Sequence, residues 1–175
     1  TLFFDYQRQH RLPIRVARIF NTYGPRMQPD DGRVVSNFIM QALRGEPITL
    51  YGDGCQVRDI LDVSNAVEAY LAAWARIEEV SGRVFNLGGG PRNAVSLRQL
   101  LDFVGRILDR PVEIAYSDWR AGDQRYFVAD TRAADQALDL SPKLDWQEGV
   151  TRLAQWLAAE GGINLPIGQP LAKSA

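Results

Sequence analysis

Two arginine-bearing segments carry the side chains best suited to chemistry in this sequence. Arg58 follows a glycine turn at residues 52–54, and Arg120 lies in a polar run that also contains Asp123. A guanidinium group offers a planar fork of donors that matches phosphate or carboxylate oxygens. If the two arginines converge, they clamp a doubly charged group such as a pyrophosphate, and Asp123 can accept hydrogen bonds from sugar hydroxyls. Because the two segments lie far apart in the sequence, spacing alone leaves open both this convergence and a solvated surface role for Arg58.

Other candidates for catalysis or metal binding are few. The chain has one cysteine, Cys55, and one histidine, His10. An intramolecular disulfide is therefore impossible, and too few ligands are present for a zinc site, so we predict no metal site. We interpret Cys55, which has no histidine nearby in the sequence, as incidental. This cysteine usage fits a reducing cytoplasm, where we expect the protein to be located.

Composition excludes several classes of partner. The 175 residues carry a net charge of -1, so no basic field points to nucleic acid or to an anionic membrane. No apolar run approaches the roughly 20 residues that a membrane-spanning helix needs. The length and a hydrophobic content of 46% are typical of a domain with a real core.

Strands and helices alternate along the first part of the chain. Residues 2–9 have a helical pattern, and residues 14–20 alternate as a strand whose exit loop is 21–25. A helix is predicted over 34–43, followed by a strand that ends at the glycine turn.

The second part continues in the same way. A helix capped by Ser64 or Asn65 is expected to turn one apolar face to the core, with Tyr70 and Trp74 as core residues rather than a ligand platform. The other members of that face are Val67, Leu71 and Ile77. Ser96 and Gln99 form a capping box, and a last helix is predicted over 147–160.

Three consecutive glycines, at 88–90, follow the strand predicted over 83–87. Their spacing matches neither the dinucleotide-binding fingerprint nor the P-loop. We therefore interpret them as a strand-exit turn. The alternation of strands and helices as a whole predicts an α/β fold.

Four short runs, in this order, resemble the NAD-dependent nucleotide-sugar epimerase/dehydratase family, which are extended short-chain dehydrogenases. They are Arg18-Ile-Phe-Asn-Thr-Tyr-Gly-Pro25, Gly52-Asp-Gly-Cys-Gln-Val-Arg58-Asp59, Phe85-Asn-Leu-Gly88 and Arg120-Ala-Gly-Asp-Gln-Arg125. The resemblance extends from Thr1 to about Leu157. It implies the carboxyl-terminal, substrate-binding half of an extended Rossmann-type enzyme, without the NAD-binding glycine motif. Residues 1–160 would then be a nucleotide-sugar-binding region truncated at its N-terminus, and residues 161–175 a loose tail.

The resemblance also implies roles for individual residues. Arg58 and Arg120 would clamp the pyrophosphate of a nucleotide-diphosphate sugar, with Asp123 near the ribose. The other implied substrate contacts are Asn21 near the phosphates, Arg33 and Asn37 along the pocket, and Leu50 and Tyr51 beside the base. Tyr23, Gly24 and Pro25 would lie by the nicotinamide of NAD.

The catalytic pair of the family, Tyr-x-x-x-Lys, is absent from the 175 residues. We therefore assign no catalytic residue, and we expect NAD to be bound mainly by an N-terminal half that this sequence lacks. Without that pair the hexose cannot be oxidised, so the polypeptide alone is predicted to be inactive. We also expect a homo-oligomer, because Leu2, Phe3 and Phe4 would expose apolar surface.

Two subfamilies share the resemblance. Residues 18–38 are most similar to UDP-glucuronate decarboxylases, whereas residues 118–125 are more similar to CDP-paratose 2-epimerases. The run Ile60-Leu61-Asp62 departs from the aromatic, cysteine-containing run of the decarboxylases. The longer match favours an epimerase-like member. A decarboxylase-like member and a non-catalytic nucleotide-sugar-binding module are the alternatives.

Overall fold

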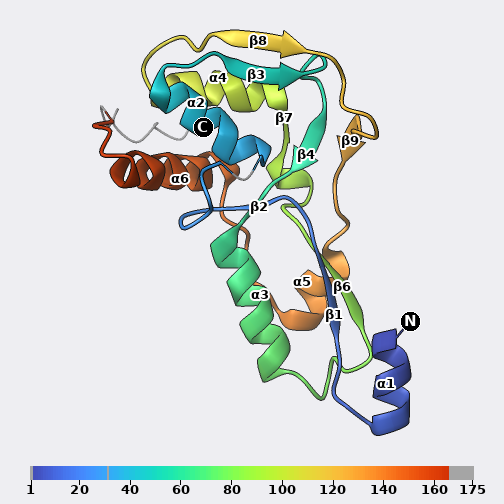
Figure 1. Ribbon diagram of the computed structural model, residues 1–175. Coiled ribbons are helices and arrows are strands. Elements are labelled where there is room, and N and C mark those ends of the chain that lie inside the picture. The colour runs from blue at the N-terminus through green and yellow to red at the C-terminus, as the bar shows by residue number, and fades with distance from the viewer. Residues whose placement is uncertain (1, 31, 166–175) are drawn as a thin grey trace. The chain divides into compact units, whose positions relative to one another are not determined.

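The computed structural model describes residues 2–30 and 32–165, and the chain divides into two compact units (Figure 1). Each unit is assembled from three stretches of sequence. Unit 1 contains Thr1–Thr22, Asp59–Ala94 and Phe127–Trp146, and unit 2 contains Tyr23–Arg58, Val95–Tyr126 and Gln147–Ala175. The region expected over residues 1–160 thus consists of interleaved units, and most of the expected tail, residues 166–175, lies outside the described residues.

Unit 1 is built on a parallel pair of strands. Strand β1 (Val16–Ile19) pairs with β6 (Val84–Leu87), so that Val16 lies opposite Val84 and Ile19 opposite Leu87. The unit also contains α1 (Leu2–His10), β5 (Leu61–Asp62), α3 (Val63–Ala75), the 3₁₀ helix η1 (Pro91–Asn93) and α5 (Arg132–Leu138). Its core joins α3, β6 and α5 through Ala66, Ala69, Phe85, Leu87 and Leu138.

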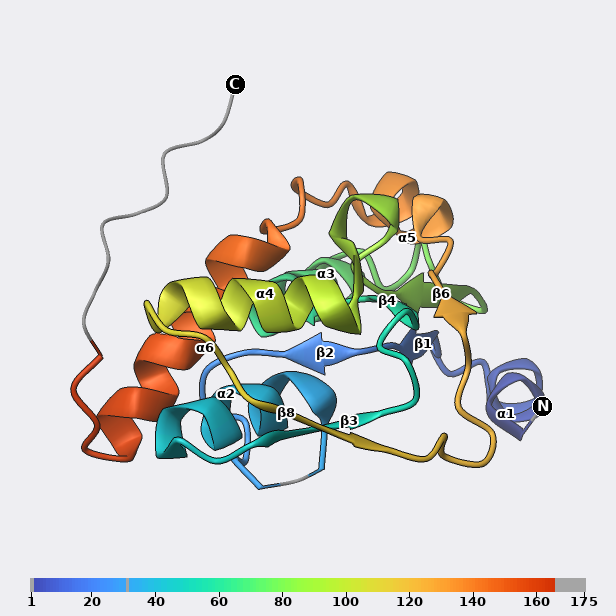
Figure 2. The ribbon, with the colours of Figure 1, turned by 90° about the horizontal axis from the view of Figure 1, so that it is seen from above.

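Unit 2 is built on a second parallel pair. Strand β3 (Ile48–Tyr51) lies beside β8 (Ile114–Ser117), as Figures 1 and 2 both show. Its helices are α2 (Val34–Arg44), α4 (Leu97–Ile107) and α6 (Trp146–Glu160). The core of the unit is formed by fully buried apolar side chains, among them Ile39, Ile48, Leu50, Leu100, Phe103, Val150 and Leu153.

The chain passes between the units inside short strands. Each of β2 (Thr22–Tyr23), β4 (Val57–Asp59), β7 (Ala94–Ser96) and β9 (Tyr126–Phe127) contains one boundary between a unit 1 stretch and a unit 2 stretch. Within β4 the boundary falls between Arg58 and Asp59.

Helix α4 begins as its sequence predicts. The Ser96 hydroxyl accepts a hydrogen bond from the Gln99 backbone N–H at 3.2 Å, and Gln99 Oε1 accepts from the Ser96 N–H at 2.9 Å. This reciprocal capping box satisfies two of the backbone donors at the helix start.

Helix α3 differs from its prediction at the cap. Asp62, rather than Ser64 or Asn65, is the N-cap residue, and its Oδ1 accepts from the Ser64 backbone N–H at 2.8 Å. A carboxylate accepts this bond without having to orient a hydroxyl and is favoured by the positive end of the helix dipole.

The prediction for the buried face of α3 is also wrong. Tyr70 is 50% exposed and Trp74 is 69% exposed, and Val67 and Leu71 are exposed as well. The core face of α3 consists of Ala66, Ala69 and Ala73. Small side chains there let the helix lie close to β6 and α5, whereas large ones would not fit in that space.

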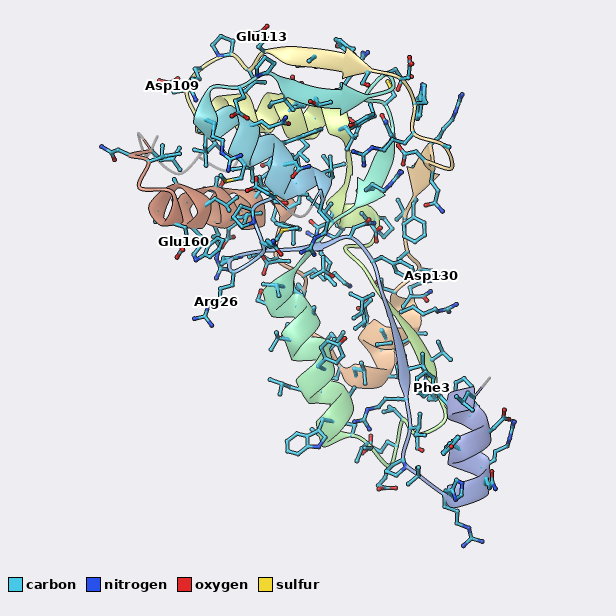
Figure 3. The ribbon with its side chains drawn as sticks, in the orientation of Figure 1. Phe3, Arg26, Asp109, Glu113, Asp130 and Glu160 are labelled. Carbon is cyan, nitrogen blue, oxygen red and sulfur yellow. The ribbon has the colours of Figure 1, made fainter. Side chains whose placement is uncertain are left out.

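Helix α1 exposes apolar side chains, as the sequence predicts. Leu2 is 67% exposed and Phe3 is 61% exposed, and Figure 3 shows the Phe3 side chain on the outside of this helix. Phe4 is half-buried.

The glycines at 88–90 make room for a buried carboxylate. A Cβ on Gly88 would lie 2.4 Å from Oδ2 of Asp59, and a Cβ on Gly89 would lie 2.2 Å from the Ile60 carbonyl oxygen. The Gly90 backbone N–H donates to Asp59 Oδ2 at 3.0 Å. The run is therefore a turn packed on residues 59 and 60, in agreement with its interpretation as a strand exit.

The substitution Gly88→Ala is expected to destabilise unit 1. Its Cβ would also lie 2.8 Å from the Cβ of Ala129, so the neighbours must move, at a cost in the upper part of the roughly 1–3 kcal/mol range for overpacking. Gly122→Ala is the control, because Gly122 has a φ of 78° and no atom within 4 Å of the added Cβ. Thermal unfolding should show a clearly lower Tm for G88A than for G122A, and equal values would contradict the packing argument.

Glu68 on α3 holds the segment after α5. The Ser141 backbone N–H donates to Glu68 Oε1 at 3.0 Å, and Asn65 Nδ2 donates to Oε2 at 3.4 Å. Hydrogen bonds from Ser141 lower the pKa of Glu68 from its ordinary value of 4.5. Since the folded-state pKa is depressed, the stabilisation is present above pH 4.5 and is lost as the pH falls through the folded-state pKa.

The variant Glu68→Gln should show a weaker acid dependence of stability than the wild type. Its Tm is expected to be lower than the wild-type Tm at pH 7 and to approach it as the pH falls below 4.5. Glu79→Gln, at an exposed position outside the helix, should leave the wild-type profile unchanged. Parallel Tm–pH curves for wild type and E68Q would exclude this role.

Candidate functional site

An open pocket lies in unit 2 and has a volume of about 280 Å³. This is near the lower end of the range of about 300–1,000 Å³ for small-molecule sites. The wall is formed by α2, the end of β3, the extended segment before and within β4, and the loop after β8. Its residues are Gly32, Val34, Asn37, Phe38, Gln41, Thr49, Tyr51, Gln56, Arg58, Leu97, Arg120 and Asp123.

The two arginine-bearing segments meet in this wall, so the convergence that spacing left open is confirmed. Arg58 Nη2 donates to Asp123 Oδ1 at 2.6 Å, and Arg58 Nη1 donates to its neighbour's carbonyl oxygen, that of Val57, at 2.8 Å. The Arg58 and Asp123 side chains are 16% and 26% exposed. An ion pair this sheltered holds the guanidinium in one orientation more firmly than a surface pair would.

Arg120 is positioned by an aromatic ring. Its guanidinium carbon lies 3.9 Å from the centroid of the Tyr51 ring, a cation–π contact. Stacking on the ring leaves the edge of the guanidinium fork free of the ring and able to donate to an anion.

The glycine turn positions the loop that carries Arg120. A Cβ on Gly52 would lie 2.6 Å from the Trp119 indole, so the absence of a side chain lets this ring lie directly on the turn. The Gly52 N–H also donates to the Ser117 carbonyl oxygen at 2.9 Å. The turn therefore fixes residues 117–119 against β3, next to Arg120.

Gln56 is a wall residue that the sequence analysis missed. It is 2% exposed, and its Nε2 donates to the Tyr51 carbonyl oxygen at 2.6 Å and lies 3.5 Å from Asp123 Oδ2. Among the described residues its Oε1 is buried without a hydrogen-bond partner. The two-residue period of an extended segment places Gln56 on the same side as Arg58, and that spacing was the available signal.

Helix α2 and strand β3 sort the remaining expected contacts. Asn37 lines the pocket, whereas Arg33 is exposed at the N-cap position of α2 and is not part of the wall. Leu50 is 0% exposed, a core residue. Since side chains alternate along a strand, Thr49 and Tyr51 face the pocket and Leu50 faces the core. The expectation that Leu50 borders a base therefore fails in this structure.

Asn21 belongs to unit 1, and it too is not part of the pocket wall. Its Nδ2 donates to Asp59 Oδ1 at 3.2 Å, and its backbone has a φ of 43°, which asparagine tolerates better than most residues. Its expected contact with a substrate stays a prediction.

Tyr23, Gly24 and Pro25 do not form a cofactor site by themselves. Tyr23 is 2% exposed, and Gly24 is buried as well. A buried ring offers no surface to a nicotinamide, and the sequence has no glycine loop for the NAD pyrophosphate. The described residues therefore do not fit NAD, and the expected contact of these three residues stays a prediction.

Two further searches cover only residues 2–30 and 32–165. Within them, no cluster of three or more His, Cys, Asp or Glu side chains is arranged to hold a metal ion. Nor does any helix in these stretches have the length and apolar character needed to cross a membrane.

Comparison with known protein families now adds to this geometry. The family model described as "NAD dependent epimerase/dehydratase family" matches residues 1–88, half of the 175-residue chain. The chain belongs to the NAD-dependent epimerase/dehydratase family. The family resemblance seen in the sequence is thereby confirmed.

Relatives of known activity agree with this family. UDP-glucuronic acid decarboxylase 6 of Arabidopsis thaliana is 41% identical over 150 residues, which are 86% of this chain and 42% of that protein. The epimerase/dehydratase chain described here thus spans less than half the length of that relative.

Solved structures confirm the α/β fold of an extended short-chain dehydrogenase. UDP-glucose 4-epimerase of Thermotoga maritima, crystallised with UDP-glucose, has a TM-score of 0.82 and 32% identity, over 89% of this chain and 49% of that one. UDP-glucuronic acid 4-epimerase of Bacillus cereus, in complex with UDP-glucuronic acid and NAD, has a TM-score of 0.83 and 25% identity, over 91% and 49%. The family uses NAD, and the latter structure contains it.

The ring beneath Arg120 is expected to contribute to anion binding. Tyr51→Leu removes the cation–π contact, worth about 0.5–1 kcal/mol at a partly exposed site, and should weaken the binding of inorganic pyrophosphate about two- to fivefold in calorimetric titration. Tyr51→Phe keeps the ring and is the matched control. Equal affinities of Y51L and Y51F would argue against the ring as the support of Arg120.

Proposed function

We propose that this chain supplies the nucleotide-sugar-binding part of an NAD-dependent enzyme that acts on a UDP-linked hexose, with UDP-glucuronate as the leading substrate. The observation that carries the proposal is the convergence of Arg58 and Arg120 on one pocket of unit 2. Both guanidinium groups are held in place, one by Asp123 and the other by the Tyr51 ring.

A diphosphate suits this arrangement. Its oxygens accept hydrogen bonds from two guanidinium forks whose orientation is already fixed, so little side-chain entropy is lost on binding. Asp123 repels a phosphate and attracts hydroxyl donors, which favours a ribose on its side of the pocket. Gln56 adds a buried acceptor, Oε1, to the same wall.

Binding at the diphosphate serves a reaction elsewhere on the substrate. Holding the remote part of the molecule fixes the hexose in register for hydride transfer, so binding energy from the diphosphate supports the chemical step. The sequence has no Tyr-x-x-x-Lys pair, so the chain described here is proposed to bind the substrate and not to oxidise it.

The nucleotide and the sugar are chosen from the relatives. Residues 118–125 are similar to CDP-paratose 2-epimerases, which favours a CDP-sugar. The relative and the two structures described above are enzymes named for UDP-glucuronic acid or UDP-glucose, and they support a UDP-sugar at least as well. We therefore place UDP-glucuronate first and a CDP-hexose second. A cytoplasmic location and a homo-oligomeric state remain part of the proposal.

Calorimetric titration of the 175-residue chain tests this function. UDP-glucuronate and UDP should bind more tightly than UMP, because UMP lacks the second phosphate. Arg58→Ala and Arg120→Ala should each weaken UDP binding about tenfold or more, in line with the loss of a charge-assisted hydrogen bond of about 1.5–3 kcal/mol. Arg152→Ala, at an exposed position of α6 in the same unit, is the control.

The outcomes separate the alternatives. Tighter binding of a CDP-hexose than of UDP-glucuronate would favour the epimerase-like candidate. A folded sample that binds neither, or R58A and R120A variants that bind UDP like the wild type, would contradict a nucleotide-sugar pocket in unit 2. Turnover of a nucleotide-sugar with NAD by this chain would contradict its assignment as the binding part alone.

A further inference from the structure

Asp59 is a fully buried carboxylate with three hydrogen-bond donors around it, all in unit 1. It is 0% exposed. Its Oδ2 accepts from the backbone N–H groups of Gly90 at 3.0 Å and Ala129 at 3.1 Å, and its Oδ1 accepts from Asn21 Nδ2 at 3.2 Å. Donors from three separate loops thus meet on one side chain.

The two oxygens of Asp59 have different partners. Oδ2 holds the main chain of the loops at Gly90 and Ala129, and Oδ1 holds only the amide of Asn21. The packing around the carboxylate is tight, because only a glycine fits at position 88 beside Oδ2. Asp59 therefore cannot swing away from Asn21 without breaking its bonds to the backbone.

This arrangement fixes the orientation of the Asn21 amide. The two ends of an amide are told apart by their hydrogen-bond partners. An ionised carboxylate only accepts hydrogen bonds, so the NH₂ end of Asn21 must face Asp59 and its carbonyl oxygen must face away. The backbone of Asn21 is also held, because its carbonyl oxygen accepts from the Leu61 N–H at 3.1 Å. Asn21 is exposed on its other side.

We infer that Asp59 is a positioning residue that orients Asn21 so that it presents its carbonyl oxygen, with one remaining N–H, to the bound nucleotide-sugar. The inference rests on the proposed function, because it takes Asn21 as a ligand contact. Asp59 acts only through Asn21 and touches no ligand itself.

The substitution Asp59→Asn separates positioning from folding. The new amide oxygen must take the place of Oδ2, because it alone can accept from Gly90 and Ala129. The new NH₂ group then faces Asn21, two donors would meet, and Asn21 must rotate by half a turn to accept instead. The buried groups stay paired, so the Tm should fall by less than about 5 °C, while the donor and the acceptor that Asn21 presents exchange places.

Nuclear magnetic resonance of the 175-residue chain reads this orientation directly. In the wild type, one proton of the Asn21 side-chain amide should exchange slowly with water, because it is bonded to Asp59. In D59N that protection should be lost. The wild-type signal needs no variant to fold, and fast exchange of both protons in the wild type would overturn the inference.

Titration with UDP-glucuronate gives the functional readout. D59N and Asn21→Ala are each expected to weaken binding about tenfold, which corresponds to about 1.4 kcal/mol. Because Asp59 acts through Asn21, adding D59N to N21A should weaken binding no further. Asp62→Asn, at another buried carboxylate of unit 1 that caps α3, is the matched control and should bind like the wild type.

The two proposals fail in different ways. If the wild type binds UDP-glucuronate but D59N or N21A binds equally well, the positioning role is overturned and the proposed function stands. Additive losses in the double variant would also overturn it. If the wild type does not bind although the Asn21 amide proton is protected, the proposed function fails, and the ligand contact assigned to Asn21 fails with it.

Discussion

The adjacent charged residues Arg58 and Asp59 are the constraint on which the described structure depends. Side chains alternate along the extended segment, so one residue contributes to the pocket of unit 2 and the next to the buried interactions of unit 1. A buried carboxylate is tolerated only when its oxygens are hydrogen-bonded, and three donors satisfy Asp59. An arginine in a sheltered wall likewise needs a counter-charge, which Asp123 provides.

Glycines make both sets of interactions sterically feasible. At Gly52 the missing side chain admits the Trp119 ring, and at Gly88 it admits the carboxylate of Asp59. The two glycine-rich segments therefore have the same physical role, close approach of a neighbouring group, although only the first lies near the candidate binding site.

Local patterns in the sequence predicted what local interactions decide. The capping box at Ser96 and the exposed apolar start of α1 depend on residues near one another in the chain, and both are found. The convergence of Arg58 and Arg120 depends on distant segments, so the side-chain types suggested it but only the fold could establish it.

What the sequence could not predict was the neighbour of each face. On α3 the alanines and the large apolar residues both follow helical spacing, and the narrow space beside β6 selects the alanines. Leu50 and Gln56 were misjudged for a similar reason, since apolar or polar character alone does not say which side of an extended segment meets the pocket.

The central claim is that the two guanidinium groups of unit 2 bind a single diphosphate. The most direct measurement is a crystal structure of this chain grown with UDP. The account predicts a diphosphate whose oxygens lie within hydrogen-bond distance of both Arg58 and Arg120, with the ribose on the side of Asp123. A nucleotide bound elsewhere, or in the pocket with its phosphates turned away from both arginines, would contradict it.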